Sequence, residues 1–264
     1  MNMNFQWANP LVFDIPEATV SATTLPAAYH MALMKLQRYG VETDCVDWNT
    51  KQKEISMTMC VANPLQEPMI SRCFIGGAEE LEQYVLEMTD GILDFEVERG
   101  KWAYTYHQRY ADQIPFVIDE LKRSPSSRRA VMVIRDKNTE MYNDDVACLQ
   151  HVHYFVRGGK LCCKVLFRSN DACKATFMNA FALIMLQKKI ADELGVEVGS
   201  YVHRANSFHC YAKDYNLLDG YCARIEAAED EDDITYEYVG DWKDDMDAAI
   251  PSIMRNVQIL KERK

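Results

Sequence analysis

The sequence predicts a globular protein of the mixed α/β (α+β) class. Segments in which apolar side chains alternate, as in strands, are interspersed with segments that have the apolar spacing of amphipathic helices. Of the 264 residues, 48% are hydrophobic, which is enough to form a sizeable core. This length allows one large domain or two small ones.

The first half of the chain is expected to contain an extended arm, one strand and three helices. Residues 1–25 show little periodicity and are assigned to the arm. Apolar spacing, capping residues and loop signals then predict the following elements: a helix over 26–39 that ends at Gly40, a strand over 53–61, a loop at Gly76 and Gly77, a helix over 78–88, and a helix over 113–122 that Ser124-Pro125 ends.

The second half is richer in strands. The same signals predict, in order, a buried strand over 130–135, two strands over 151–156 and 160–167 joined through Gly158 and Gly159, a long helix over 177–194, and a short strand over 207–212. The acidic run 226–233 is expected to be a solvated linker or turn. The tail 244–264 looks helical, with Pro251 either in its first turn or breaking it.

These features divide the chain into an N-terminal arm (1–25), a main domain (26–222) and an acidic segment with a C-terminal helix (223–264). The net charge of -11 argues against general adhesion to nucleic acid or to a membrane, because anionic surfaces would repel the chain. We see no leader peptide in the first residues, and nine scattered cysteines do not form a disulfide framework. A reduced, cytoplasmic protein is therefore expected.

Two kinds of site are suggested by the residues alone. Arginines at strand ends, in Ser127-Arg128-Arg129 and Arg168-Ser169, suit the capture of a phosphate group, although surface salt bridges are the plainer explanation. Cys148, His151 and His153 could suggest zinc. They lack the paired ligands two to four residues apart that structural zinc sites normally have, so no metal is expected.

Five short motifs follow one another in this order: SPSSRR (124–129), AC (147–148), FRSND (167–171), FMNAFALIMLQKKIA (177–191) and SFHCY (207–211). The series resembles the superfamily of thymidylate synthases and deoxynucleotide hydroxymethylases, and is most similar to the phage enzymes that hydroxymethylate dCMP or dUMP. The resemblance implies a catalytic domain over 26–222 with a mixed, twisted sheet and helices on one face. It also implies a homodimer in which two such sheets pack back to back.

The resemblance assigns roles at the nucleotide. Cys148 matches the nucleophile that adds to the pyrimidine ring. Arg168 and Ser169 match ligands of the phosphate in the same subunit. Arg128 and Arg129 match the arginines that reach across the dimer interface to the phosphate in the partner subunit. A thiol nucleophile needs a lowered pKa, and we expect the nearby guanidinium groups to supply the positive field.

Further residues match those around the base, the sugar and the folate. Asp171 matches an aspartate that lines the base and folate site, and Asn179 matches the residue that reads the pyrimidine edge. His209 and Tyr211 match the pair that binds the 3′-hydroxyl of the deoxyribose. The two remaining matches are catalytic: Glu80, in ELEQY (80–84), for the glutamate that manages protons, and Tyr104 for the active-site tyrosine.

The one-carbon donor implied by the family is 5,10-methylenetetrahydrofolate. Synthases have histidine after the nucleophile, glutamine before the Arg-Ser pair and a short apolar C-terminus, whereas this chain has Leu149, Phe167 and KERK (261–264). These departures favour hydroxymethylation of the nucleotide over methylation. Asparagine at 179 favours dUMP over dCMP, because an amide can donate to O4 and accept from N3–H. A thymidylate synthase and an inactive nucleotide-binding protein are the alternatives.

Overall fold

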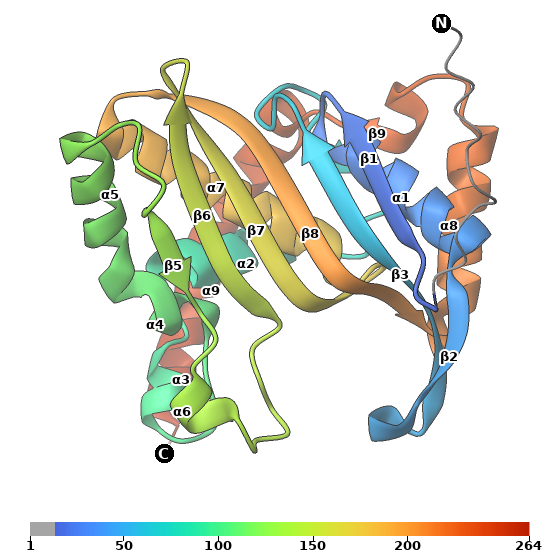
Figure 1. Ribbon diagram of the computed structural model, residues 1–264, viewed down its shortest axis with the longest axis horizontal. Helices are drawn as coiled ribbons and strands as arrows, with labels where there is room; N and C mark the ends of the chain where they lie inside the picture. The colour runs from blue at the N-terminus through green and yellow to red at the C-terminus, as the bar shows by residue number, and fades with distance from the viewer. Residues whose placement is uncertain (1–13, 264) are drawn as a thin grey trace, which may run out of the picture.

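A seven-stranded mixed sheet lies at the centre of the protein, which is seen here in a computed structural model that describes residues 14–263 (Figure 1). The strand order is β1-β3-β8-β7-β6-β5, and β2 also pairs with β3. The strands of this sheet are β1 (Glu17–Ala22), β2 (Val41–Cys45), β3 (Thr50–Val61), β5 (Val131–Val133), β6 (Leu149–Arg157), β7 (Lys160–Asp171) and β8 (Glu197–Tyr211). A small second ladder pairs β4 (Ile70–Ser71) with β9 (Thr235–Tyr236).

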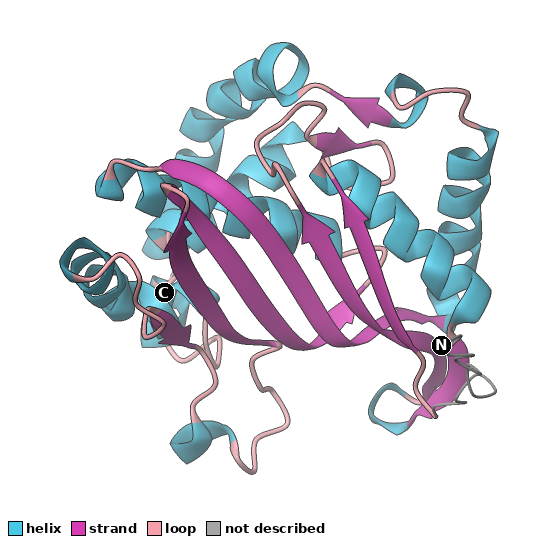
Figure 2. Ribbon diagram, turned by 45° about the horizontal axis from the view of Figure 1, so that its top comes forward, coloured by secondary structure: helices cyan, strands magenta, loops and turns pink. Residues whose placement is uncertain are grey.

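Helices pack against one face of the sheet and leave much of the other face uncovered (Figure 2). This arrangement confirms the predicted fold class. The helices of the described part are α1 (Leu25–Tyr39), α2 (Ala78–Asp90), α3 (Phe95–Glu98), α4 (Tyr106–Tyr110), α5 (Ile114–Arg123), α6 (Lys137–Glu140), α7 (Thr176–Leu194), α8 (Tyr215–Ala227) and α9 (Lys243–Glu262). Among residues 14–263, no helix has the length and apolarity needed to cross a membrane.

Helix α7 forms the centre of the hydrophobic core. It is apolar on nearly every side, as expected of a helix that is covered all round by α1, α2, α5 and the sheet. Phe177, for example, is buried against Tyr29, with ring centroids 5.5 Å apart. Burying one such side chain stabilises the fold by roughly 1.5–3 kcal/mol. The polar side chains on α7 are therefore held in fixed positions by the packing around them.

Most predicted elements are confirmed. The structure contains the helices expected over 26–39, 78–88, 113–122 and 177–194, with ends that differ by no more than two residues. Gly40 caps α1, as predicted. The hairpin of β6 and β7 turns through Gly158 and Gly159, which both have positive φ angles (59° and 76°) that favour glycine.

Three strands differ from the prediction. The short strand expected over 207–212 is the end of the 15-residue β8, whose alternation is hidden because buried His203 interrupts its apolar face. Part of the expected arm is β1, which pairs in parallel with β3, while residues 1–13 of that arm lie outside the described residues. The strand expected over 130–135 is only the three-residue β5 at the sheet edge, and Val133 on it is exposed.

The C-terminal segment also differs. Contrary to the prediction, α9 continues through Pro251, which is exposed and lies in the third turn rather than the first. Buried Ile253 and Val257, which pack with Leu93, hold the rest of the helix in place. The boundary predicted at residue 222 falls inside α8, and β9 pairs with β4, so the residues after 222 pack onto the main domain.

Candidate active site

The pairing of β6 with β7 places Cys148 beside Arg168. The backbone N–H of Arg168 donates to the carbonyl of Cys148 at 2.8 Å. The guanidinium folds back on the segment before β6, where Nε donates to Ala147 O at 3.2 Å and Nη2 to Val146 O at 2.9 Å. The predicted nucleophile and the predicted phosphate ligand are therefore brought together where β6 begins and β7 ends.

The parallel pairing of β7 with β8 brings the predicted sugar ligands to the same place, where both strands end. Ser169 lies opposite Ser207 and Asp171 opposite His209 in the register of the two strands. The Ser169 hydroxyl is 3.4 Å from His209 Nδ1, and the rings of His209 and Tyr211 are 4.8 Å apart. His209 Nε2 is buried and has no hydrogen-bond partner among the described residues, which suits a hydrogen bond to a bound ligand.

Asp171 shapes the connection between β7 and α7. Its Oδ1 accepts hydrogen bonds from the backbone N–H groups of Cys173 and Lys174, at 3.0 and 2.9 Å. Its carbonyl accepts from the Thr176 hydroxyl at 2.9 Å. These bonds form a tight turn that fixes where α7 begins relative to the sheet edge. In this structure Asp171 therefore positions the start of α7, next to the predicted nucleotide ligands.

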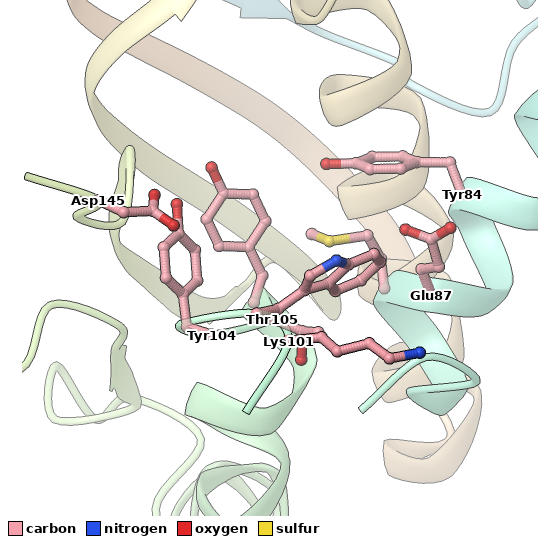
Figure 3. Close-up of a pocket in the computed structure, with 9 residues that line it drawn as sticks. Tyr84, Glu87, Lys101, Tyr104, Thr105 and Asp145 are labelled. Carbon is pink, nitrogen blue, oxygen red and sulfur yellow. The ribbon is translucent and has the colours of Figure 1, made fainter. Parts of the chain in front are cut away.

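An aromatic cavity of about 350 Å³ opens between α2 and residues 101–106 (Figure 3). Cys148 is not one of its lining residues, but it lies near enough to Tyr84, Tyr104 and Tyr106 to affect the pKa of each hydroxyl. Tyr104, one of the predicted residues, lines it, and its hydroxyl donates to Val146 O at 3.4 Å. Burial raises the pKa of Tyr104 to about 12, and the nearby Cys148 thiol adds to this shift. The cavity is lined by Tyr84, Glu87, Met88, Lys101, Trp102, Tyr104, Thr105, Tyr106 and Asp145.

Asn179 lies in the first turn of α7 and is only 5% exposed. Its side-chain oxygen accepts a hydrogen bond from the hydroxyl of Tyr84, which lines the cavity from α2. Burial raises the pKa of Tyr84 well above its usual value, with a smaller contribution from Cys148. The predicted base-reading residue is thus linked to the cavity through a tyrosine that the sequence analysis did not single out.

Glu80 is not brought to the cavity. It is exposed in the first turn of α2, where Oε2 accepts from the backbone N–H of Gly77 at 2.9 Å, as in a capping box. Seven residues further along the same helix, Glu87 lines the cavity, and burial raises the pKa of its carboxyl. The helical spacing of Glu80, Tyr84 and Glu87 puts this carboxyl on the same side of α2 as Glu80, so the sequence could have suggested it as a second candidate.

Arg128 and Arg129 lie away from Cys148 in this chain. Both are exposed between α5 and β5, and Arg129 forms an ion pair of 2.6 Å with Glu120. The Arg128 carbonyl accepts from the ring of His153, which is five residues along β6 from Cys148. At about 3.3 Å per residue this separation is on the order of 16 Å. The pair therefore does not belong to the cluster around Cys148 and Arg168.

The environment of the Cys148 thiol differs from the expectation in one respect. Burial raises its pKa above the usual value, and the charge of Asp145 adds to that rise. The guanidinium of Arg168 acts in the expected direction and lowers the pKa, but its effect is smaller than that of burial. The zinc alternative finds no support among residues 14–263, where no three His, Cys, Asp or Glu side chains are grouped as metal ligands.

Comparison with known proteins identifies relatives of this chain. The family model described as thymidylate synthase matches residues 83–237. The chain is 30% identical over 213 residues to a protein of Methanocaldococcus jannaschii named "Putative thymidylate synthase", covering 76% of this chain and 95% of the relative. It is 30% identical over 152 residues to the thymidylate synthase of Bacillus licheniformis, covering 54% of this chain and 51% of the relative.

The solved structure of the thermostable thymidylate synthase A from Bacillus subtilis has the same fold. It superposes with a TM-score of 0.63 at 18% identity, over 76% of this chain and 85% of that one. At this identity the likeness shows a shared fold. With the family match over more than half of its length, the chain belongs to the thymidylate synthase family.

The opposing effects on Cys148 predict the pH dependence of its alkylation. With iodoacetamide, the midpoint of the rate profile should lie above that of a free thiol, near 8.5, because burial disfavours the thiolate. Arg168→Gln should move the midpoint further up, because a positive charge is lost. Peptide mass spectrometry separates Cys148 from the other eight cysteines. Arg204→Gln, at an ion pair with Glu17, is the control, and an unchanged midpoint in Arg168→Gln would contradict the assignment.

Proposed function

We propose that this protein transfers a one-carbon unit to C5 of dUMP through a covalent bond between Cys148 and C6, and releases 5-hydroxymethyl-dUMP. The observation that carries this proposal is that the pairing of β6 with β7 brings Cys148 and Arg168 together, close to Tyr104 in the wall of the aromatic cavity. A phosphorylated pyrimidine needs a thiol near its C6 atom and a cation near its phosphate. It also needs a flat apolar surface against its ring.

The nucleotide ligands come from the ends of β7 and β8. Arg168 and Ser169 would hold the phosphate, and the unpartnered Nε2 of His209, together with Tyr211, would hold the 3′-hydroxyl. Asp171 would keep the start of α7 against this group, so that Asn179 faces the base. These contacts orient C6 toward the Cys148 thiol.

The family takes its one-carbon unit from 5,10-methylenetetrahydrofolate, and the cavity residues suit such a group. The rings of Trp102, Tyr104 and Tyr106 offer flat surfaces for a pterin and an aminobenzoyl ring, and Lys101 at the rim offers a cation for a carboxylate. When bound there, the folate supplies an electrophilic carbon at the oxidation level of formaldehyde.

The residues of this chain then carry out proton and electron-pair transfers. The Cys148 thiolate forms a bond to C6 and moves an electron pair toward C5 and O4, which makes C5 nucleophilic. After C5 has gained its carbon, loss of the C5 proton breaks the bond between that carbon and the folate nitrogen, so that tetrahydrofolate would leave. A water oxygen then bonds to the carbon and gives up a proton, and the thiolate leaves C6 as the ring double bond re-forms. The Glu87 carboxyl, whose pKa burial raises above its usual value, is suited to give and take these protons.

Access of water to the cavity favours hydroxymethylation. Among the described residues, none after Asp145 lines the cavity. The end of α9 lies against Arg99 instead, whose guanidinium donates to the carbonyls of Leu260 and Lys261. The C-terminal residues that the structure describes therefore do not cover the cavity, which supports the route through water. Reductive methylation to dTMP is the second candidate, favoured by the thymidylate synthase names of the relatives.

Incubation with dUMP or dCMP and methylenetetrahydrofolate, followed by mass spectrometry of the nucleotide, tests the proposal. We expect dUMP to gain CH2O and tetrahydrofolate to appear. A gain of CH2 with dihydrofolate would replace hydroxymethylation by methylation. Cys148→Ala should abolish turnover and retain nucleotide binding, whereas wild-type protein that binds but never turns over would indicate an inactive binding protein.

A comparison of two glutamates tests the assignment of the proton-transfer group. Glu87→Gln should lower kcat by roughly 10²–10⁴-fold, because an amide cannot exchange protons. Glu80→Gln, on the same helix but exposed, is the matched control and should change kcat by less than about tenfold, through the helix cap alone. Equal losses in both variants would argue against Glu87.

We further propose that the protein acts as a homodimer in which Arg128 and Arg129 bind the phosphate held by the partner subunit. Support comes from their exposure away from Cys148 and from the uncovered sheet face, which carries Phe155, Leu166 and Val202 among polar residues. Half-buried apolar side chains on an uncovered face are typical of an interface.

Subunit mixing tests this sharing. Cys148→Ala mixed with the double variant Arg128→Ala/Arg129→Ala should recover up to about a quarter of wild-type activity, because hybrids regain one complete site. Cys148→Ala mixed with Arg168→Ala is the control and should recover none, since both residues serve the same subunit's site. Equal results in the two mixtures would contradict the shared arginines.

A further inference from the structure

Tyr84 and Asn179 form a buried contact between α2 and α7 at the wall of the cavity. The Tyr84 hydroxyl donates to Asn179 Oδ1, and Figure 3 shows this hydroxyl pointing across the cavity rather than into solvent. The Asn179 side-chain nitrogen has no partner among the described residues, and it is not among the fully buried unpartnered atoms. The donor end of the amide is therefore free for a ligand.

An asparagine alone does not distinguish uracil from cytosine. With its NH2 group toward position 4 it donates to the uracil O4 and accepts from N3–H. After a flip of 180° it accepts from the cytosine 4-amino group and donates to N3. The two orientations differ little in shape. Discrimination at Asn179 therefore requires a neighbour that holds the amide in one orientation.

Tyr84 has the properties of that neighbour. Desolvation keeps its phenol protonated, so it brings one proton that needs an acceptor. In the observed orientation, Asn179 Oδ1 accepts this proton and keeps a second lone pair for N3–H of the base. After a flip, the amide NH2 would face the phenol oxygen, and the phenol proton would lose its acceptor in a buried setting, which is costly. The contact thus favours one orientation.

We propose that Tyr84 is a positioning residue that selects uracil over cytosine by fixing the amide of Asn179 with its NH2 group toward position 4 of the base. The inference rests on the proposed binding of a pyrimidine nucleotide at Cys148. A uracil O4 meets a donor in this arrangement, whereas a cytosine 4-amino group meets a second donor and is rejected. The selectivity is thus shared between two helices and does not reside in Asn179 alone.

The test is the ratio of affinities for dUMP and dCMP, measured by calorimetry without folate. Tyr84→Phe removes the hydroxyl and keeps the ring, and we expect the dUMP preference to fall by about tenfold or more, mainly because dCMP binds better. Tyr110→Phe is the matched control, with its ratio unchanged, because it removes another buried hydroxyl that bonds to α2, at the Met88 carbonyl, but does not line the cavity. If Tyr84→Phe does not fold, Tyr84→Met removes the hydroxyl as well and should show the same loss.

The outcomes separate this inference from the proposed function. Binding of both nucleotides with the same ratio in wild type and Tyr84→Phe would overturn the role of Tyr84 and leave the nucleotide site intact. Equal losses of affinity for both nucleotides would also overturn it, because they indicate a merely structural tyrosine. Wild-type protein that binds neither nucleotide would overturn both proposals. In turnover assays, Tyr84→Phe should lower KM for dCMP and leave kcat for dUMP nearly unchanged.

Discussion

The site depends on the antiparallel pairing of β6 with β7. Cys148 is the residue before β6, and the hydrogen bond from Arg168 N to its carbonyl extends the ladder by one step. Because antiparallel partners run in opposite directions, the beginning of one strand meets the end of the other. A thiol and a guanidinium twenty residues apart in the sequence thus become neighbours, and β8, parallel to β7, adds His209 at the same edge.

Local signals predicted the elements whose patterns are complete within a short segment. The glycine pair at 158–159 and the alternation around it define the β6–β7 hairpin, and the apolar run of α7 defines a buried helix. Pairing with distant strands decided the rest. β1 is polar at every second position and is a strand because β3 lies beside it. In β8, His203 is buried because its ring forms hydrogen bonds with Asn170 and Tyr201. Pro251 is tolerated because packing on both sides holds α9.

The sequence predicted the strand-borne part of the candidate site better than the helix-borne part. Cys148, Arg168 and His209 lie at strand ends, where alternation and register fix the direction of a side chain. On α2, by contrast, Glu80, Tyr84 and Glu87 share one side of the helix, and spacing alone does not tell which of them is level with the cavity. The packing of α2 against α7 decides it, and this contact joins residues 95 positions apart.

Electrostatics support the proposal that two subunits share the site. The chain carries a net charge of -11, and the phosphate of a nucleotide adds nearly two more negative charges. At the candidate phosphate position this chain offers the guanidinium of Arg168, part of whose donors are used on the carbonyls of Val146 and Ala147. The same guanidinium also has to counteract the effect of burial, which raises the pKa of Cys148. In the proposed dimer, the exposed Arg128 and Arg129 of a second subunit would add positive charge for both tasks.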